Sequence, residues 1–437
     1  MRSGRTVALL APAAGLAASL LVLHPGQYSF DSAYQLWQAR SGAFNDTSPV
    51  AMTALWSLLL TLVANPASLL WVNLALFWAG LGLCVATVAR SPWMRLVLLS
   101  LLGFAPLTLV EMGQLLSDAH LAALLTFATG LAAWGLARRQ RTPLFVACAV
   151  LVYAGCVRHN APIAILPFGA IAAQALLPAR AEARERQIPG DTGTNDARAL
   201  RAIGWRTACG AALALALTSV VLGAALDRML AREHATVWPS LALWDLAAIS
   251  VAHETMLLPP FTHGPGLTAD ELVATGAFDP TSNTLLYQKS HSGVRDGLGE
   301  SYSAPQLRAL RRAWVAAALR YPGAYLRHRL RTLWLLIGPH RGAIQGTAYF
   351  EARTSYRDNP PLPAPFAPNA QRRLYALAAS LVPTWCFAAL PYLIASLLAI
   401  TVAARHEVPG RVAIAVAVSA IVYTLPLALL APAAELR

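Results

Sequence analysis

The sequence predicts an all-α integral membrane protein, because it is long, strongly apolar and repeatedly interrupted by apolar stretches of helical length. Apolar residues make up 57% of the 437 residues, charged residues make up only 13%, and the mean hydropathy is +0.50. A helix needs about 17 to 25 residues to cross a hydrocarbon layer of about 30 Å, so we expect about nine transmembrane helices. The apolar stretches lie near residues 7–23, 68–89, 96–112, 119–137, 143–157, 161–178, 207–226, 374–402 and 411–432.

The arginines predict how these helices are oriented. With a cytoplasmic N-terminus, the short cytoplasmic segments carry fifteen arginines, whereas the short outer segments carry three, Arg40, Arg158 and Arg437. This distribution follows the positive-inside rule. The first apolar stretch follows two arginines and precedes no small-residue cleavage site, so we expect a retained signal anchor. An alanine- and arginine-rich chain of this kind is expected in a bacterial cytoplasmic (inner) membrane.

The apolar pattern also predicts the domain organisation. Residues 1–226 form a membrane domain of seven spans, and residues 374–437 form the C-terminal spans. The first outer loop, 25–67, contains a short apolar segment at 52–64 that we expect to be an interfacial helix. The hydrophilic stretch 227–373 is predicted to be a small extracytoplasmic loop domain. Its arginine-rich end has helical periodicity and is expected to form amphipathic helices on the outer leaflet.

Missing motifs exclude several common classes of protein. The single lysine, Lys289, follows no glycine-rich turn, so the chain has no P-loop. The patterns HExxH, GxSxG and CxxC do not occur, which excludes the common metalloproteases, the hydrolases with a nucleophile elbow and the thioredoxin-like proteins. The pattern DxD, which holds the metal-bound sugar nucleotide in many soluble glycosyltransferases, does not occur either. The positive charge follows the membrane topology and does not indicate binding to nucleic acid.

The acidic residues carry the sharpest functional signal. The first 178 residues contain four carboxylates, Asp31, Asp46, Glu111 and Asp118, and the predicted topology places all four at or near the outer face. Each has a local alternative: Asp31 and Asp118 as helix N-caps, Asp46 in an Asx turn, and Glu111 as an interfacial acid. The functional hypothesis is that Asp31 and Asp118 converge on one outer cavity, where a carboxylate accepts a proton from an attacking hydroxyl or amine. No metal site is predicted, because these acids have no metal-ligand spacing, and whether a divalent metal is needed stays open.

Basic residues on the same face are candidates for binding phosphate. Arg158, His159 and Asn160 form a predicted outer turn between the fifth and sixth spans. An arginine there departs from the cytoplasmic arginine pattern and suits a phosphate at headgroup level. The alternative is that Arg158 anchors the span to anionic lipid. On the same topology Arg437 also lies outside.

These segments resemble, in order, those of the GT-C superfamily of polytopic membrane glycosyltransferases, which includes protein O-mannosyltransferases and lipid A aminoarabinose transferases. FDSAYQLWQARSGAFNDTSPVAMTALWSLL resembles the first outer loop of the family, and GFAPLTLVEMGQLLSDAHLAAL resembles the segment with its second outer acid. LVYAGCVRHNAPIAILP resembles its Arg-Asn turn, whereas ALWDLAAIS and LRYPGAYLRHRLRTLWLLIG resemble the entry and exit of its extracytoplasmic domain. The resemblance covers roughly the first three quarters of the chain.

The resemblance implies transfer of a sugar from a polyprenyl-phosphate donor to an acceptor on the outer, periplasmic face, with inversion at the anomeric carbon. Asp31 matches the catalytic aspartate, Asp118 the second acid and Arg158 a contact to the lipid phosphate. Because a polyprenyl phosphate leaves readily, the site needs a base and positive charge, and no cofactor is predicted. The remaining candidates are His159 and Arg437 for the donor phosphate, and Asn45, Asp46 and Asn160 for the donor or acceptor. Thr47-Ser48-Pro49 departs from the His-Pro that many members have.

Two other functions stay open from the sequence. A transporter or flippase for a lipid-linked solute should have ionisable residues near span centres and broken helices in matching halves, whereas the acids here lie at span ends. A non-catalytic membrane assembly factor would use the 227–373 domain to bind a partner. The sequence identifies neither the sugar nor the acceptor, which is a protein, a glycan or a lipid.

Overall fold

The computed structural model of the chain describes residues 2–176, 195–290, 293–297, 301–339, 354–403 and 408–431, and every regular element among them is a helix. The helices of the N-terminal half are α1 (Arg2–Leu23), α2 (Phe30–Ser41), α3 (Val50–Val63), α4 (Ser68–Val88), α5 (Pro92–Gly103), α6 (Pro106–Met112), α7 (Ser117–Arg138), α8 (Arg141–Cys156) and α9 (Ala161–Leu176). Those that follow are α11 (Asn195–Leu230), α12 (Trp238–His253), η1 (Pro260–Thr262), α13 (Ala269–Ala274), α14 (Thr284–Lys289), α15 (Ala304–Arg320), α16 (Pro322–Ile337), α17 (Pro368–Leu381), α18 (Ala389–Ala403), α19 (Val408–Thr424) and α20 (Leu427–Leu430).

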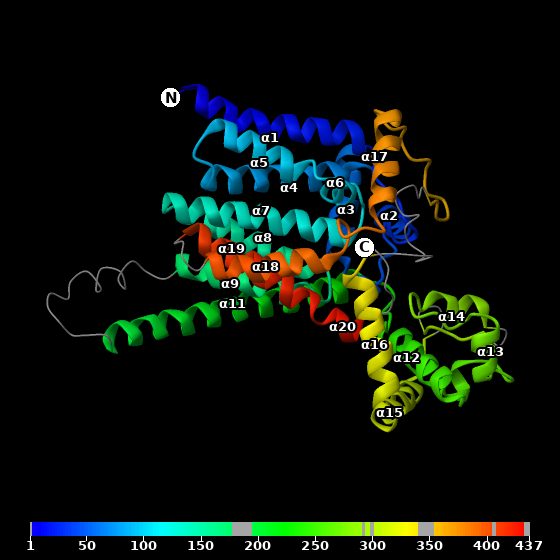
Figure 1. Cartoon of the computed structure of the whole chain (residues 1–437). Helices are drawn as coiled ribbons and strands as arrows, with labels where there is room; N and C mark the ends of the chain where they lie inside the picture. Colours follow the sequence, from blue (N-terminus) through cyan, green and yellow to red (C-terminus); the bar gives the residue numbers. More distant parts are fainter. Residues whose placement is uncertain are drawn as a thin grey trace.

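The apolar helices lie side by side in one bundle (Figure 1). Its tightest crossing joins α4 to α7 through two glycines. A Cβ atom at Gly80 would lie 2.5 Å from the backbone of Phe127, and one at Gly130 would lie 2.4 Å from the Gly80 carbonyl oxygen. Small residues allow helices in an apolar environment to approach closely, so this crossing holds α7 firmly in the bundle.

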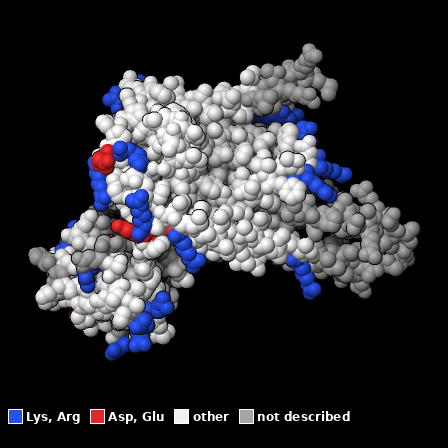
Figure 2. All heavy atoms as spheres, turned by 180° about the vertical axis from the view of Figure 1, so that it is seen from behind, with Lys and Arg blue, Asp and Glu red and all other residues white. Residues whose placement is uncertain are grey.

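The bundle has the properties of a membrane protein. Among the described residues, three helices are long and apolar enough to cross a bilayer: α4, α7 and the 206–230 part of α11. A fourth span results if α5 and α6 are one broken helix, and six further apolar helices are shorter. Figure 2 shows that the broad middle of one face carries uncharged side chains, whereas arginine and lysine gather toward its ends. The chain is therefore an all-helical membrane protein, and the count of nine spans stays a prediction.

Two predicted spans differ in shape from the observed helices. The stretch 96–112 is divided into α5 and α6, which meet at an angle of 63°. The break falls where Pro106 begins α6, since proline has no N–H to continue the preceding helix. The stretch 374–402 is also divided into two helices, α17 and α18, and α17 ends two residues before Pro383. The two helices differ in direction: α17 lies across the ends of the bundle helices, whereas α18 runs along them (Figure 1).

A second core lies beyond one end of the bundle, in the unit formed by α12 to α16. Ala242, Leu246, Leu272 and Leu286 are fully buried in it. The predicted amphipathic helices are present there as α15 and α16, and α16 runs across the bundle ends (Figure 1). Exposed positions of α16 carry the apolar side chains Leu326, Leu330 and Trp334 together with arginines, whereas its buried side chains are polar: His328, Arg329 and Thr332.

Candidate functional site

The two predicted catalytic acids lie at the starts of helices at the same end of the bundle. The segments that precede α2 and α7 pair with each other: the Gln27 N–H donates to the Gly113 carbonyl at 2.9 Å, and the Leu115 N–H donates to the Gln27 carbonyl at 3.4 Å. Asp31 and Asp118 each lie in the first turn of the helix that follows. The backbone therefore gives both acids the same level in the bundle.

Asp118 forms an ion pair with Arg158, which begins the turn between α8 and α9. The Arg158 Nη1 donates to the Asp118 carboxylate and lies 3.4 Å from the Ser117 hydroxyl oxygen. The N-cap of α7 is Leu116, with no side-chain cap, so the N-cap alternative for Asp118 is wrong. Both side chains are 25% exposed, and one carboxylate leaves most of the five guanidinium donors available for a ligand.

Two side chains complete this polar cluster. The hydroxyl of Tyr423, on α19, adjoins the Asp118 carboxylate and the Asn160 side chain. His159, between Arg158 and Asn160 in the same turn, is exposed. The turn thus brings together three of the predicted residues, and Tyr423 is an addition that the sequence did not suggest, because it lies far along the chain in an apolar helix.

A cavity of about 740 Å³ extends into the bundle, within the range of ligand pockets of about 300 to 1,000 Å³. Asp118 and Tyr423 of the polar cluster line it, whereas Arg158, His159 and Asn160 lie outside its lining. Glu111, Asp118 and Tyr423 give it polar groups, and most of the rest is apolar. Lining residues on α7 run from Asp118 to Thr129, which is about 17 Å at 1.5 Å per residue. The helices that contribute are α4, α6, α7, α9, α16, α18, α19 and α20. This shape fits a ligand with a polar head and a long apolar tail.

Asp31 lies outside the lining of this cavity, so the expected convergence of Asp31 and Asp118 on one cavity is not observed among its lining residues. The N-cap of α2 is Ser29, whose hydroxyl accepts from the Ser32 N–H at 3.3 Å, so the N-cap alternative for Asp31 is also wrong. Glu111, in contrast, lines the cavity beside Asp118, and the two carboxylates interact electrostatically. Glu111 therefore belongs to the site, although its position near a span end suggested only an interfacial acid.

The helix that carries Asp31, α2, has an aromatic face. Phe30, Tyr34 and Trp37 follow one face of α2, and Tyr356 packs against all three at centroid distances of 5.1 to 5.7 Å. The guanidinium of Arg357 lies 4.2 Å from the centre of the Trp37 ring. The segment after residue 354 thus folds back onto the first turns of α2, an arrangement that the sequence did not predict.

Asn45 and Asp46 hold the loop between α2 and α3 in place. Asn45 forms the Asx turn, because its side-chain oxygen accepts from the Thr47 N–H at 3.2 Å. Asp46 instead accepts from the Ala235 N–H at 2.6 Å and lies 2.8 Å from the His234 ring nitrogen. The Asx turn expected at Asn45-Asp46-Thr47 is therefore present, with Asn45 as its side-chain acceptor, and both side chains have structural partners. Arg437 lies outside the described residues.

A buried histidine fixes the helix that carries Asp118. His120 is fully buried in α7, and its two ring nitrogens lie 2.6 Å from the Asn73 oxygen of α4 and 3.1 Å from the Tyr153 hydroxyl of α8. Polar groups inside a membrane bundle pair with one another because lipid offers them no partner. The isolated polar residues in apolar stretches were the signal available in the sequence.

Among the described residues, no group of three or more His, Cys, Asp or Glu side chains is arranged to hold a metal ion. Comparisons of the chain with protein-family models, with curated proteins and with solved structures gave no match. The features of the described residues that bear on function are the Asp118–Arg158 pair and the cavity that Asp118 lines.

Proposed function

We propose that this protein is a membrane glycosyltransferase of the GT-C type, which moves a sugar from a polyprenyl-phosphate donor to an acceptor on the outer face of the bacterial cytoplasmic membrane. The observation that carries the proposal is the Asp118–Arg158 cluster at one end of a largely apolar cavity. The cavity suits a polyprenyl chain, and the arginine suits the phosphate that joins this chain to the sugar.

Each group has a role in the proposed reaction. The acceptor hydroxyl or amine attacks the anomeric carbon while the bond from that carbon to the phosphate oxygen breaks. Asp31 takes the proton of the attacking group, and the departing polyprenyl phosphate keeps the electron pair of the broken bond. Arg158 stabilises the charge on this phosphate, and Asp118 orients the guanidinium. Tyr423 and Asn160 are further contacts to the phosphate or sugar.

The decisive experiment measures release of polyprenyl phosphate from a radiolabelled polyprenyl-phosphate sugar, in membranes of the source organism that hold the native acceptors. Asp31→Asn and Arg158→Gln should each lower turnover about 10² to 10³-fold, since removal of one preorganised charge or donor costs about that factor. Arg158→Lys should retain part of the activity. Arg40→Gln is the matched control, because Arg40 is exposed and donates to the Asp358 carbonyl. Unchanged turnover in both Asp31→Asn and Asp118→Asn would remove the catalytic assignment.

One observation favours a second function, a transporter or flippase for a lipid-linked solute. The α5–α6 break of 63° places the ionisable Glu111 beside an internal cavity, and broken helices of this kind are typical of transporters. A flippase moves a fluorescent lipid-linked solute across the bilayer without releasing polyprenyl phosphate. Reconstituted vesicles therefore separate the two functions: translocation of an intact lipid supports the transporter, and release of polyprenyl phosphate supports the transferase.

A further inference from the structure

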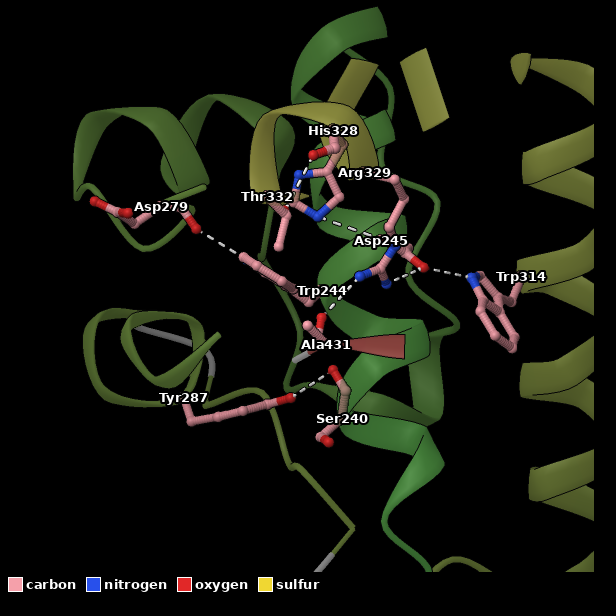
Figure 3. A network of polar contacts seen from close by, with 10 residues as sticks. All are labelled: Ser240, Trp244, Asp245, Asp279, Tyr287, Trp314, His328, Arg329, Thr332 and Ala431. Carbon is pink, nitrogen blue, oxygen red and sulfur yellow. Dashed lines mark hydrogen bonds and ion pairs between the residues drawn. The ribbon is translucent and has the colours of Figure 1, made fainter. Parts of the chain in front are cut away.

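A buried carboxylate in the α12–α16 unit has no role in the chemistry proposed above. Asp245 lies in the middle of α12 and is fully buried. The Trp314 indole N–H donates to Asp245 Oδ2 at 2.9 Å, and Arg329 Nη2 lies 2.6 Å from the same oxygen (Figure 3). His328 Nε2 is 3.5 Å from Asp245 Oδ1. Burial, with Arg329 and Arg331 nearby, lowers the pKa of His328 to about 3, so Arg329 supplies the neutralising charge.

Arg329 joins three segments that are distant in sequence. Its side chain is 2% exposed on α16. One guanidinium nitrogen reaches Asp245 of α12, and another, Nη1, donates to the carbonyl of Ala431, just after α20, at 2.8 Å. The guanidinium carbon also lies 5.7 Å from the centre of the Trp244 ring (Figure 3). Two of these three segments, α16 and α20, are walls of the cavity that Asp118 lines.

The cavity residues on these helices are close to the ion pair. On α16, Leu333, Leu336 and Ile337 line the cavity one to two turns after Arg329, and side chains four, seven and eight positions apart share one helix face. On α20, Leu427 lines the cavity and accepts the backbone N–H of Ala431 at 3.1 Å. The guanidinium is therefore connected to both walls.

Beside the face that carries Arg329, α16 has an exposed apolar strip. Leu326, Leu330 and Trp334 follow one another at intervals of four residues and are 51%, 62% and 53% exposed. A buried ion pair is weak evidence for stability, because desolvation of the two charges offsets most of their attraction. What such a pair adds is a defined arrangement, since Arg329 meets both partners only when α12, α16 and α20 are correctly placed.

We propose that the Asp245–Arg329 pair is a positioning device through which the α12–α16 unit sets the cavity walls formed by α16 and α20, and so controls entry of an apolar chain. Arg329 acts through these walls and is a positioning residue. The inference uses the cavity but not the transferase chemistry, so it is tested without turnover.

Cys84 is a native reporter for the test, because it lines the cavity. In the full chain, Cys148, Cys156, Cys209 and Cys386 are replaced by alanine, and the rate at which pyrene maleimide labels Cys84 is measured in nanodiscs. Arg329→Gln should raise this rate about tenfold, because α16 and α20 then lose the contact that holds them against the cavity and move away from it more often. Arg329→Lys keeps the charge but not the two-pronged contact, and should give a smaller increase.

Arg331→Gln is the matched control, because Arg331 is exposed on the same helix. It should leave the labelling rate unchanged. If Arg329→Gln does not fold, Arg329→Lys decides. Equal Cys84 labelling in wild type and in a folded Arg329 variant would overturn the positioning role. A changed labelling rate in a protein that shows no sugar transfer would support it and still reject the transferase, so the two proposals fail separately.

Discussion

The most direct prediction is that a large side chain placed in the cavity weakens binding of the donor. Ala122 on α7 lines the cavity one turn along the helix from Asp118. Replacing it with tryptophan places an indole in the space where the apolar chain of the donor is proposed to lie. The polar cluster is untouched, so Ala122→Trp separates binding of the chain from binding of the phosphate.

The size of the effect follows from the apolar surface that the indole displaces. Each methylene removed from water into an apolar site contributes about 0.8 kcal/mol. Exclusion of about four methylenes therefore costs about 3 kcal/mol, which is about a hundredfold in the dissociation constant. If the chain of the donor partitions between the cavity and lipid, the loss of affinity is smaller, because lipid is also apolar. We therefore expect the dissociation constant to rise at least about tenfold.

The assay is competition binding in detergent, where a fluorescent polyprenyl phosphate is displaced by an unlabelled donor. Ala214→Trp is the matched control, because Ala214 is exposed on α11 and does not line the cavity. It should bind as the wild type does. Equal affinities for wild type, Ala122→Trp and Ala214→Trp would refute the assignment of the cavity to the apolar chain.

Three further predictions concern stability. Burial raises the pKa of Asp245 from 3.8 to about 6, so the folded state binds this proton more tightly than the unfolded chain does. The free energy of unfolding should therefore fall by up to about 3 kcal/mol as the pH rises from 4 to 6. Melting curves recorded over this pH range measure the decrease, which should be absent in Asp245→Asn. Asp46→Ala removes the acceptor of the Ala235 N–H, which should cost about 1 to 2 kcal/mol in thermal unfolding without lowering turnover of the folded protein. Gly80→Leu forces α4 away from α7 and should destabilise the protein by about 1 to 3 kcal/mol. Gly210→Leu is the control and should not destabilise it, because the space around a Cβ atom at Gly210 is open. Equal melting temperatures of the two variants would contradict the close crossing of α4 and α7.

The sequence predicted the features that depend on short stretches of chain. The apolar runs at 68–89 and 119–137 are α4 and α7, because a run of this length buries its backbone polar groups only as a helix. The turn at Arg158 was predicted from the same pattern. The ends of helices were harder to predict. The 374–402 run contains both α17 and α18, which are separated near Pro383, and Tyr375 and Ala378 of α17 pack in a cluster of their own.

The candidate site was predicted in part. The sequence singled out Asp118 and Arg158 because both were unusual for their places in the topology, but their local contexts allowed an N-cap and a lipid anchor equally well. The structure selected the ion pair, since α7 and the α8–α9 turn meet at one end of the bundle. The partners of Asp46 were out of reach for the same reason, because His234 lies 188 residues away.

The amino-acid sequence by itself determined that this protein is helical and belongs in a membrane, since hydropathy and periodicity act over one helix at a time. It also placed the acids of the first 178 residues near span ends. Only the tertiary structure decided that Asp118 pairs with Arg158, that Glu111 and Tyr423 line a cavity with Asp118, and that Arg329 joins α12 to the segment after α20. These contacts link distant segments, and they form because charged groups removed from water require partners that only the packed helices bring within reach.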